Sequence, residues 1–279
     1  VGSNKVVTAN SITLADGING GLASNYSIST GQTTIANITA KTLTATASTS
    51  NKVYDGLTTA TTTLTFSGLI GSETLDQTVL STFNNKNAGT GKTVTVNSIT
   101  LADGSNGGLA ANYSISAGQT TTANITAKSL TVSGITASNK TYDGSTNATL
   151  TGTAVYSGLV GGDTFDGTYT GAFSDKNVGT GKTVTITPSY SGADVSNYSI
   201  TNHADVTANI TVRSLTVSGI TASDKTYDGS VTATMDGTAA VYSGLVSGDT
   251  FNGTYTGVFS DANVGTGKTI NITSSYSGA

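Results

Sequence analysis

Cysteine and tryptophan are absent from this sequence, and proline occurs only once, at position 188. Without cysteine the chain has no disulfide to staple its fold and no thiol to act as a nucleophile. A chain without disulfides suits export across a bacterial outer membrane in the unfolded state, because a disulfide would obstruct threading. With no tryptophan and only 6% aromatic residues, a sugar-binding surface of large flat rings is disfavoured.

Charge is also scarce. Only 10% of the residues are charged, and the twelve lysines and arginines are scattered along a chain of net charge −4. The absence of a basic cluster argues against a nucleic-acid partner. The sequence is too apolar for a disordered chain, yet it has no run near eighteen apolar residues, so we expect no membrane span. It does not begin with methionine and shows no signal peptide, so we expect any targeting segment to lie outside it.

Four short motifs recur at a common spacing. Tyr-Asp-Gly begins at positions 54, 142 and 227, and Asn-Tyr-Ser-Ile begins at 25, 112 and 197. Gly-Thr-Gly-Lys begins at 89, 179 and 265, and Ala-Asn-Ile-Thr begins at 36, 123 and 208. All these spacings lie between 85 and 90 residues, which is the length of a small autonomous β domain.

The repeat divides the chain into four stretches, called here the first, second, third and fourth copies. The first copy, 1–40, is the C-terminal part of a repeat; 41–128 and 129–213 are full repeats; and 214–279 is the N-terminal part of another. Because both ends fall inside a repeat, we expect the sequence to be a window on a much longer fibre.

Alternation with a period of two dominates each copy. In 93–96 threonine alternates with valine, the pattern of a strand with one buried and one solvent-facing side. Glycine-rich stretches supply turns, and Gly-Thr-Gly-Lys is interpreted as a hairpin turn. The stretch 69–80 is the only one in which we expect a short helical turn. Short strands with regular turn signals predict an all-β fold of tandem Ig-like β-sandwich repeats of about 85–88 residues.

The junctions between copies show a change of parity. In the stretch 123–132, Ile125 falls on an odd position, whereas Leu130 and Val132 fall on even positions. One extended segment that changes its buried face near Lys128 would end one sandwich and begin the next. Since no flexible spacer intervenes, we expect stiff joints in an elongated rod. At ~3.3 Å per residue, each repeat should add roughly 35–45 Å of length.

A Lys-x-Tyr-Asp-Gly motif lies near the start of each of the three later copies and is the main candidate site. Asp-Gly is a strong turn dipeptide, because Asp bonds nearby backbone and Gly tolerates positive φ. We interpret the motif as a structural turn in which the Tyr ring closes the sandwich rim and the Lys ammonium reaches water. Its residues are Lys52, Tyr54, Asp55, Gly56, Lys140, Tyr142, Asp143, Gly144, Lys225, Tyr227, Asp228 and Gly229.

The motif has two chemical alternatives, a calcium site and a catalytic site. Calcium takes six or more oxygen ligands, so Asp163, Asp166 or Asp175 would have to join the turn. The sequence predicts no cofactor and leaves calcium as the alternative. Catalysis is not expected, because His203 is the only histidine and has no counterpart in the other copies. We therefore expect that the protein is not an enzyme.

The combined motifs resemble a known family. Lys-x-Tyr-Asp-Gly-x-x-x-Ala-Thr is followed by Gly-Leu-Val-Gly-Gly-Asp at 158–163, Asn-Val-Gly-Thr-Gly-Lys at 177–182, Asn-Tyr-Ser-Ile at 197–200 and Ala-Asn-Ile-Thr at 208–211. This series is similar to the YDG domain of large bacterial surface proteins, which resemble filamentous haemagglutinin-like adhesins of the two-partner secretion type. The resemblance covers essentially the whole chain. It implies an extracellular stalk, tethered to the outer membrane or released, and supplies no catalytic residues.

These observations lead us to expect a structural stalk or filament segment of a secreted surface adhesin that supports cell adhesion or biofilm. Its expected partners are neighbouring repeats, other copies in a fibre, and a host or cell-surface receptor or glycan of unknown identity. The alternative is an array of carbohydrate-binding modules in which Tyr156, Tyr169 or Tyr190 stacks on sugars. Strand exchange between the partial copies of two chains is a minority hypothesis. A continuous polypeptide is the simpler explanation of the same ends.

Overall fold

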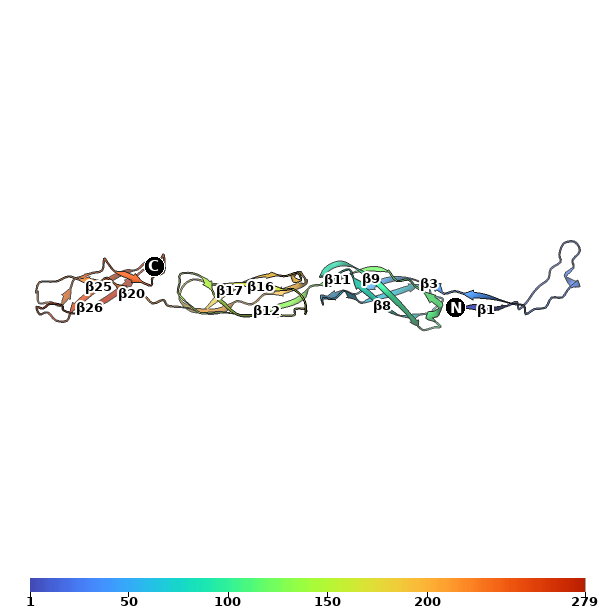
Figure 1. The fold of residues 1–279 in the computed structure, drawn as a ribbon, viewed down its shortest axis with the longest axis horizontal. Coiled ribbons are helices and arrows are strands. Elements are labelled where there is room, and N and C mark those ends of the chain that lie inside the picture. Colours follow the sequence, from blue (N-terminus) through green and yellow to red (C-terminus); the bar gives the residue numbers. More distant parts are fainter. Residues whose placement is uncertain (279) are drawn as a thin grey trace. The chain divides into compact units, whose positions relative to one another are not determined.

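The computed structural model describes residues 1–278, and its regular structure is almost entirely β-strand (Figure 1). Within this range the helical segments are three short 3-10 turns, η1 (Ala23–Asn25), η2 (Ala110–Asn112) and η3 (Val195–Asn197). Each of these turns ends on the Asn of an Asn-Tyr-Ser-Ile motif. The predicted all-β fold is therefore confirmed. None of the described helices is long and apolar enough to cross a membrane.

The chain forms two compact units, which are described separately. Unit 1 comprises residues 1–130 together with 158–165 and 192–199, and unit 2 comprises 131–157, 166–191 and 200–279. By sequence, the segments 158–165 and 192–199 are loops of the third copy. They nevertheless pack with the second copy, so unit 1 contains the junction between these two copies.

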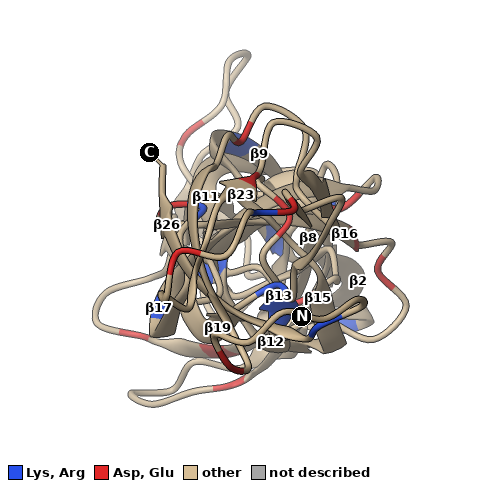
Figure 2. Ribbon diagram, turned by 90° about the vertical axis from the view of Figure 1, so that its left-hand side faces the viewer, with Lys and Arg blue, Asp and Glu red and all other residues tan. Residues whose placement is uncertain are grey.

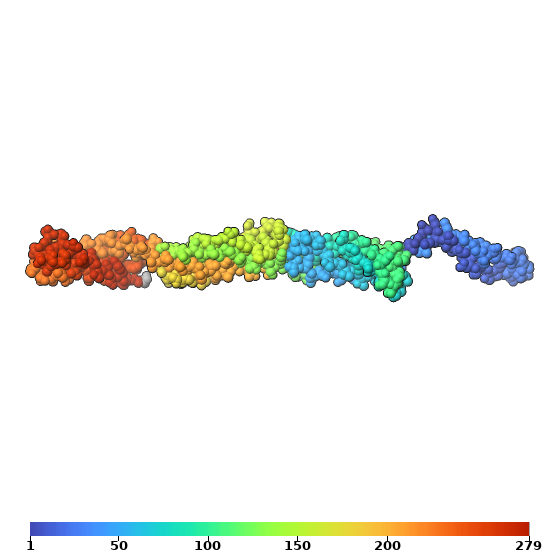
Figure 3. Space-filling view, turned by 90° about the horizontal axis from the view of Figure 1, so that it is seen from below, coloured from blue at the N-terminus to red at the C-terminus, as the bar shows by residue number. Residues whose placement is uncertain are grey.

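The first copy, in unit 1, consists of one strand pair and a loop. β1 (Gly2–Thr8) runs antiparallel to β2 (Thr33–Ile38), with Val6 opposite Ile35. On the face drawn in Figure 3, this dark blue segment meets the rest of the chain only at one end, and its apolar side chains are largely exposed. A two-stranded ribbon of this kind is marginally stable by itself.

The second copy folds as two sheets that pack against each other. In the smaller sheet region, β4 (Thr44–Thr49) is antiparallel to β7 (Thr62–Ser67), and β3 (Lys41–Thr42) is parallel to β10 (Tyr113–Ser114). The larger sheet has the order β5-β11-β9-β8-β6. Its strands span Lys52–Val53, Thr120–Thr126, Gly89–Asp103, Leu75–Phe83 and Thr59–Ala60, respectively. Edge strand β5, which carries the motif lysine, runs parallel to β11.

Alternating side chains supply the core of the second copy. In β9, Val94 and Val96 are fully buried, whereas the intervening threonine stays at least partly exposed, as the period-two pattern predicted. Leu43, Leu75 and Tyr113 form a second buried cluster, at the end of the second copy where β3 and β10 pair. The apolar faces of both sheets therefore meet in one interior.

The third copy repeats this architecture. Its larger sheet has the order β13-β19-β17-β16-β14, with bounds Lys140–Thr141, Val206–Thr211, Gly179–Ser191, Asp166–Phe173 and Asn147–Ala148. Its smaller sheet has the order β15-β12-β18, with bounds Leu150–Ser157, Lys128–Ala137 and Tyr198–Thr201. In the part within unit 2, Phe173, Val184, Ala208 and Ile210 form a buried cluster.

The fourth copy, in unit 2, contains shorter ladders. β20 (Thr216–Ser218) pairs with β24 (Val241–Ser243), and β21 (Thr221–Ala222) pairs with β23 (Met235–Asp236). A third sheet has the order β22-β25-β26, with bounds Thr232–Ala233, Asn252–Phe259 and Ile270–Ser277. Among the described residues β26 pairs with β25 alone, whereas its counterpart β17 lies between two strands.

The predicted change of buried face is confirmed at the junction of the second and third copies. β11 ends at Thr126 and β12 begins at Lys128, and both Ile125 and Leu130 are fully buried despite their opposite parity. At the next junction the expectation of an uninterrupted strand is wrong, because 212–215 lie between β19 and β20 without strand pairing. The described part of the fourth copy has no strand equivalent to β18, which pairs with β12 in the third copy.

Two local predictions are also wrong. Gly-Thr-Gly-Lys is not a hairpin turn, because it begins the long strands β9 and β17. Gly91 has a φ of 60°, its N–H donates to Asn124 Oδ1 at 2.8 Å, and the register of β9 and β11 shifts at this point, which defines a bulge. Residues 69–80 hold no helical turn, since β8 begins within them at Leu75.

Charged side chains are sparse along the ribbon and mixed in sign (Figure 2). Several lysines pair with an aspartate of their own copy, as Lys182 does with Asp175 at 2.6 Å. Positive and negative side chains therefore lie close together in these pairs.

Burial distinguishes two leucines of the second copy. Leu43 is 3% exposed in the core, whereas Leu80 is 63% exposed on β8. We expect Leu43→Ala to lower the free energy of unfolding by about 2–5 kcal/mol, because it leaves a cavity, and Leu80→Ala to change it by less than about 0.5 kcal/mol. Urea denaturation followed by circular dichroism measures both. Equal effects of the two substitutions would contradict the assigned core.

Candidate functional site

The Lys-x-Tyr-Asp-Gly motif of the second copy builds a turn with its own charged residues. The Lys52 ammonium donates to Asp55 Oδ1 at 2.7 Å and to the carbonyl oxygens of Leu57 and Thr59 at 2.8 and 3.0 Å. Asp55 Oδ1 also accepts the N–H of Leu57 at 2.9 Å. The ammonium lies 5.7 Å from the ring centre of Phe83. The lysine is thus tied into the turn, rather than simply reaching water as the sequence suggested.

The same turn recurs in the later copies. Lys140 donates to Asp143 at 2.8 Å, and Lys225 lies 2.7 Å from Asp228. The N–H of Ser145 donates to Asp143 Oδ1 at 2.9 Å, and Ser230 does the same to Asp228. Lys and Asp of the motif therefore have a local role in each of the three copies.

The motif glycine serves both the turn and the next copy. Gly56 has a φ of 79°, a conformation that side chains with a Cβ rarely adopt. A Cβ at this position would lie 3.0 Å from Cγ1 of Val160, in the 158–165 loop of unit 1. In unit 2, a Cβ on Gly144 would lie 2.7 Å from Cγ1 of Val246. A larger residue would therefore strain the turn and push against the following copy.

The motif tyrosine makes the main contact across the junction. Tyr54 is 1% exposed, and its hydroxyl lies 3.0 and 2.9 Å from the two carboxylate oxygens of Asp163, to which it donates. Tyr198 donates to the same carboxylate and accepts the N–H of Val160 at 2.9 Å. The rings of Tyr54 and Tyr198 meet edge to face, with centres 5.6 Å apart. One buried carboxylate thus joins a tyrosine of the second copy to a tyrosine of the third.

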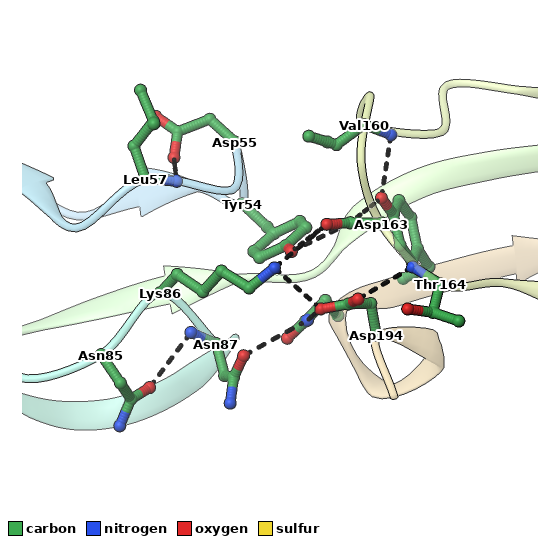
Figure 4. A network of polar contacts seen from close by, with 12 residues as sticks. Tyr54, Asp55, Leu57, Asn85, Lys86, Asn87, Val160, Asp163, Thr164 and Asp194 are labelled. Carbon is green, nitrogen blue, oxygen red and sulfur yellow. Dashed lines mark hydrogen bonds and ion pairs between the residues drawn. The ribbon is translucent and has the colours of Figure 1, made fainter. Parts of the chain in front are cut away.

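A lysine bridges the two acidic groups at this junction (Figure 4). Lys86, in the loop between β8 and β9, lies 3.1 Å from Asp163 Oδ1 and 2.9 Å from Asp194 Oδ1. Asp194 Oδ2 accepts the N–H of Thr164 at 3.0 Å. The Lys86 ammonium also lies 5.9 Å from the centre of the Tyr54 ring. One cation from the second copy therefore compensates two anions of the third.

An asparagine adds a backbone contact between copies. Asn197 is buried, and its Oδ1 accepts the N–H of Ala88 at 2.9 Å. At the junction of the first and second copies, Asn112 Oδ1 accepts from the amino group of Val1 at 3.0 Å in the same way. Val1 and Ala88 occupy equivalent positions of the repeat, as do the two asparagines. The Asn of Asn-Tyr-Ser-Ile is thus a second recurring junction residue.

Burial and hydrogen bonding shift the titration of these groups in opposite directions. Burial, together with the bond to Asp163, raises the pKa of Tyr198 to about 12, and the same two causes raise the pKa of Tyr54. Burial opposes ionisation of Asp163, but the bonds from Tyr198, Tyr54 and Lys86 outweigh it, so the pKa of Asp163 is lowered. Asp194 and Asp163 hold the pKa of Lys86 above its usual range. At neutral pH the tyrosines are therefore neutral donors to an ionised carboxylate.

Unit 2 contains a second junction of the same type. Tyr142 donates to Asp249 Oδ2 at 2.9 Å, and Asp249 is the counterpart of Asp163. In the second copy, Glu73 occupies the position equivalent to Asp163, and its carboxylate accepts a hydrogen bond from the hydroxyl of Tyr113. Tyr227, in the fourth copy, is 64% exposed. Tyr54 is fully buried and Tyr142 partly buried at their junctions with the following copy.

Several of the other candidate residues have partners of their own. No cluster of three or more His, Cys, Asp or Glu side chains that could hold a metal occurs among the described residues. Asp163 faces Lys86, and Asp175 faces Lys182 at 2.6 Å, so the carboxylates weighed for calcium point to lysines instead. His203 is half-buried, and its Nε2 accepts the N–H of Ile135 at 3.1 Å.

Sequence reasoning recognised the turn but missed the partner of its tyrosine. Tyr54 and Asp163 are 109 positions apart, and Tyr142 and Asp249 are 107 apart. The available signal was the acidic residue that recurs at 73, 163 and 249 in the same place of each repeat. An acidic residue that recurs beside the Gly-rich loop of each copy is a signal for a partner outside its own copy.

Removing the shared carboxylate should loosen the junction. We expect Asp163→Ala to lower the free energy of unfolding of unit 1 by about 3–5 kcal/mol, because Lys86 and two buried hydroxyls lose their acceptor. Hydrogen exchange at the N–H groups of Val160 and Ala88 should accelerate. The control is Asp166→Ala, at an exposed carboxyl three residues away. Equal exchange in both variants would contradict the role of Asp163.

The motif turn should lose stability in acid. Lys140 and the N–H of Ser145 hold the pKa of Asp143 at about 2, below its ordinary 3.8, and Lys225 does the same for Asp228. Because the folded-state pKa is lowered, this contribution is complete above about pH 4 and is lost as the pH falls toward 2. We expect the melting temperature to drop across this window, and to drop less in Asp143→Asn/Asp228→Asn. Parallel pH profiles of the two proteins would contradict this prediction.

Comparison with known proteins identifies one family. The model of the YDG domain matches residues 39–123, 126–208 and 211–279. No curated protein and no solved structure gives a match. Each matched stretch contains one Lys-x-Tyr-Asp-Gly turn, and together they cover most of the sequence. The chain therefore belongs to the YDG domain family and contains three tandem matches to it.

Proposed function

We propose that this chain is a structural segment of a stalk or filament in a secreted bacterial surface adhesin. In this role it projects a binding region from the cell and supports adhesion or biofilm, without enzymatic activity. The observation that carries the proposal is the junction in which Tyr54 and Lys86 of one copy hold Asp163 of the next.

The chemistry of the family motif supports a mechanical role. Its Lys and Asp are used within the turn, and its Gly and Tyr contact the following copy. Groups that are saturated by internal hydrogen bonds are poor candidates for binding or transforming a substrate. A motif repeated to join one copy to the next is what a chain built for length requires.

The proposed location is the bacterial cell surface or the medium around it. The absence of cysteine suits export without disulfide formation, and the abundance of short Thr, Ser, Asn and Gly side chains suits an exposed surface. Few charges and few exposed aromatics leave the tip or other regions of a larger protein to carry specific recognition.

The carbohydrate-binding alternative has less support. Tyr156, Tyr169 and Tyr190 are half-buried and pack against the core cluster of Val132 and Ile186. The Tyr169 hydroxyl donates to that of Tyr156 at 3.1 Å, and the rings of Tyr169 and Tyr190 meet edge to face. Part of each ring is therefore used in packing within the copy instead of being presented to a sugar. Binding of the chain to a glycan array would restore this alternative.

Small-angle scattering tests the stalk. At roughly 35–45 Å per repeat, a rod of three repeats has a radius of gyration of about 35 Å, whereas a compact globule of this length has about 19 Å. We expect the larger value for the chain, and a flexible profile for Asp163→Ala/Asp249→Ala, in which both junction carboxylates are removed. A compact particle, or a variant as stiff as the unmodified chain, would refute the proposal.

A further inference from the structure

We propose that Tyr156 and Tyr169 are a modification site, at which a one-electron oxidant couples the two rings to a dityrosine that joins the two sheets of the third copy. Tyr242 and Tyr255 form the equivalent site in the fourth copy. The proposal rests on the way in which each pair of hydroxyls is held together. It goes beyond the stalk function and does not depend on it.

The two tyrosines of each site lie on different sheets and meet through their hydroxyls. Tyr156 is on β15, in the smaller sheet of the third copy, and Tyr169 is on β16, in the larger sheet. The Tyr169 hydroxyl donates to that of Tyr156 at 3.1 Å. In the fourth copy the hydroxyls of Tyr242 on β24 and Tyr255 on β25 are 3.0 Å apart. The same contact thus joins separate sheets in both copies.

A glycine makes room for each pair of hydroxyls. A Cβ on Gly167 would lie 2.5 Å from the hydroxyl oxygen of Tyr169 and 2.7 Å from that of Tyr156. A Cβ on Gly253, the counterpart of Gly167 in the fourth copy, would collide with both hydroxyls of that site. A side chain at either glycine would therefore force the two hydroxyls to move.

The second copy joins its sheets differently at the equivalent positions. Phe66 and Val79 replace the two tyrosines there, and Gln77 replaces the glycine. The Gln77 side-chain amide bonds both backbone groups of Leu64, with Oε1 3.2 Å from the nitrogen and Nε2 2.7 Å from the oxygen. Since Leu64 is on β7 and Gln77 is on β8, this contact also joins the two sheets. The tyrosine pair is the oxidisable one of these two links.

Oxidative coupling of the paired rings proceeds in balanced steps. Each phenol gives one electron to the oxidant and one proton to the solvent, and the resulting radical has unpaired density on the Cε atoms. One Cε of each ring forms the new C–C bond. Each coupled Cε then loses its hydrogen as a proton, and each oxygen regains a proton. The chain loses two hydrogen atoms in all, and with hydrogen peroxide as the terminal oxidant one peroxide is reduced to two waters.

The product keeps a contact that the folded chain already makes. In dityrosine both hydroxyls are adjacent to the new bond, so their oxygens stay within hydrogen-bonding distance of each other, as they are in each site. Holding the reacting groups together replaces a bimolecular encounter by an intramolecular step. All four rings are half-buried, so a small oxidant reaches part of each ring.

Neighbouring tyrosines have other partners. The Tyr190 hydroxyl donates to Asn202 Oδ1 at 3.0 Å. In unit 1, Tyr54 and Tyr198 both donate to Asp163, and they are only 1% and 7% exposed. Coupling their rings would pull hydroxyl donors away from a buried carboxylate, which is costly. We therefore expect the modification to be specific to the two hydroxyl pairs.

Peptide mapping after oxidation tests the site. The whole chain in dilute solution is treated with hydrogen peroxide and a small haem peptide, and is then digested by a protease that cleaves before aspartate. This digestion places Tyr156 in peptide 143–162 and Tyr169 in peptide 166–174. We expect these two peptides in one species that is lighter than their sum by two hydrogen atoms and has the fluorescence of dityrosine. Peptides 236–248 and 249–260 should be joined in the same way.

A pair of phenylalanine variants provides the control. Tyr156→Phe/Tyr242→Phe removes one hydroxyl from each site, and Phe66 of the second copy shows that phenylalanine fits this position. Because the remaining tyrosine of each site loses its held partner, we expect the dityrosine yield to fall about tenfold. Tyr26→Phe/Tyr227→Phe, at two exposed rings, should keep the full yield.

Three results would overturn the proposal. They are a folded chain that forms no dityrosine, a main product that joins other tyrosines, and an undiminished yield in Tyr156→Phe/Tyr242→Phe. The same oxidation of the chain unfolded in urea should lose the specific product, because the hydroxyls are then no longer held together. An unchanged product in urea would also contradict the proposal.

Discussion

The junction between consecutive copies depends on one buried carboxylate. The Asp163 side chain is only 3% exposed, and an ionised group in such a place is stable only when it is paired and hydrogen-bonded. Two tyrosine hydroxyls and the Lys86 ammonium meet this requirement, and they come from both copies. These contacts lie in the loops 158–165 and 192–199, which belong to the same compact unit as the second copy.

The strands, the repeat and the change of sheet between copies were predictable because each depends on a local sequence pattern. Alternating Thr and Val in 93–96 predict a strand with one buried face. The spacing of the motifs predicts the length of the repeat. The change of parity between Ile125 and Leu130 marks where the chain changes sheets, since successive strand residues face opposite sides. The Asp-Gly turn follows equally from the conformational freedom of its glycine.

What the sequence did not predict depends on residues distant in the chain. Tyr54 was assigned to the rim of its own sandwich, but its hydroxyl partner belongs to the next copy. The bulge at Gly91 needs the side chain of Asn124, which lies on a neighbouring strand. Residues 212–215 pair with no strand in the described part of the chain, although their local sequence resembles that of the preceding junction. The Tyr54 hydroxyl bond and the Gly91 bulge both depend on a partner that no local pattern names.

The most direct test of this account is a double-mutant cycle between Tyr54→Phe and Asp163→Ala, measured by chemical denaturation of the whole chain. If the hydroxyl and the carboxylate act as one junction, the two losses should be non-additive, with a coupling energy of about 1–3 kcal/mol. Losses that add to within about 0.5 kcal/mol would show that the two residues act independently and would contradict the junction described here.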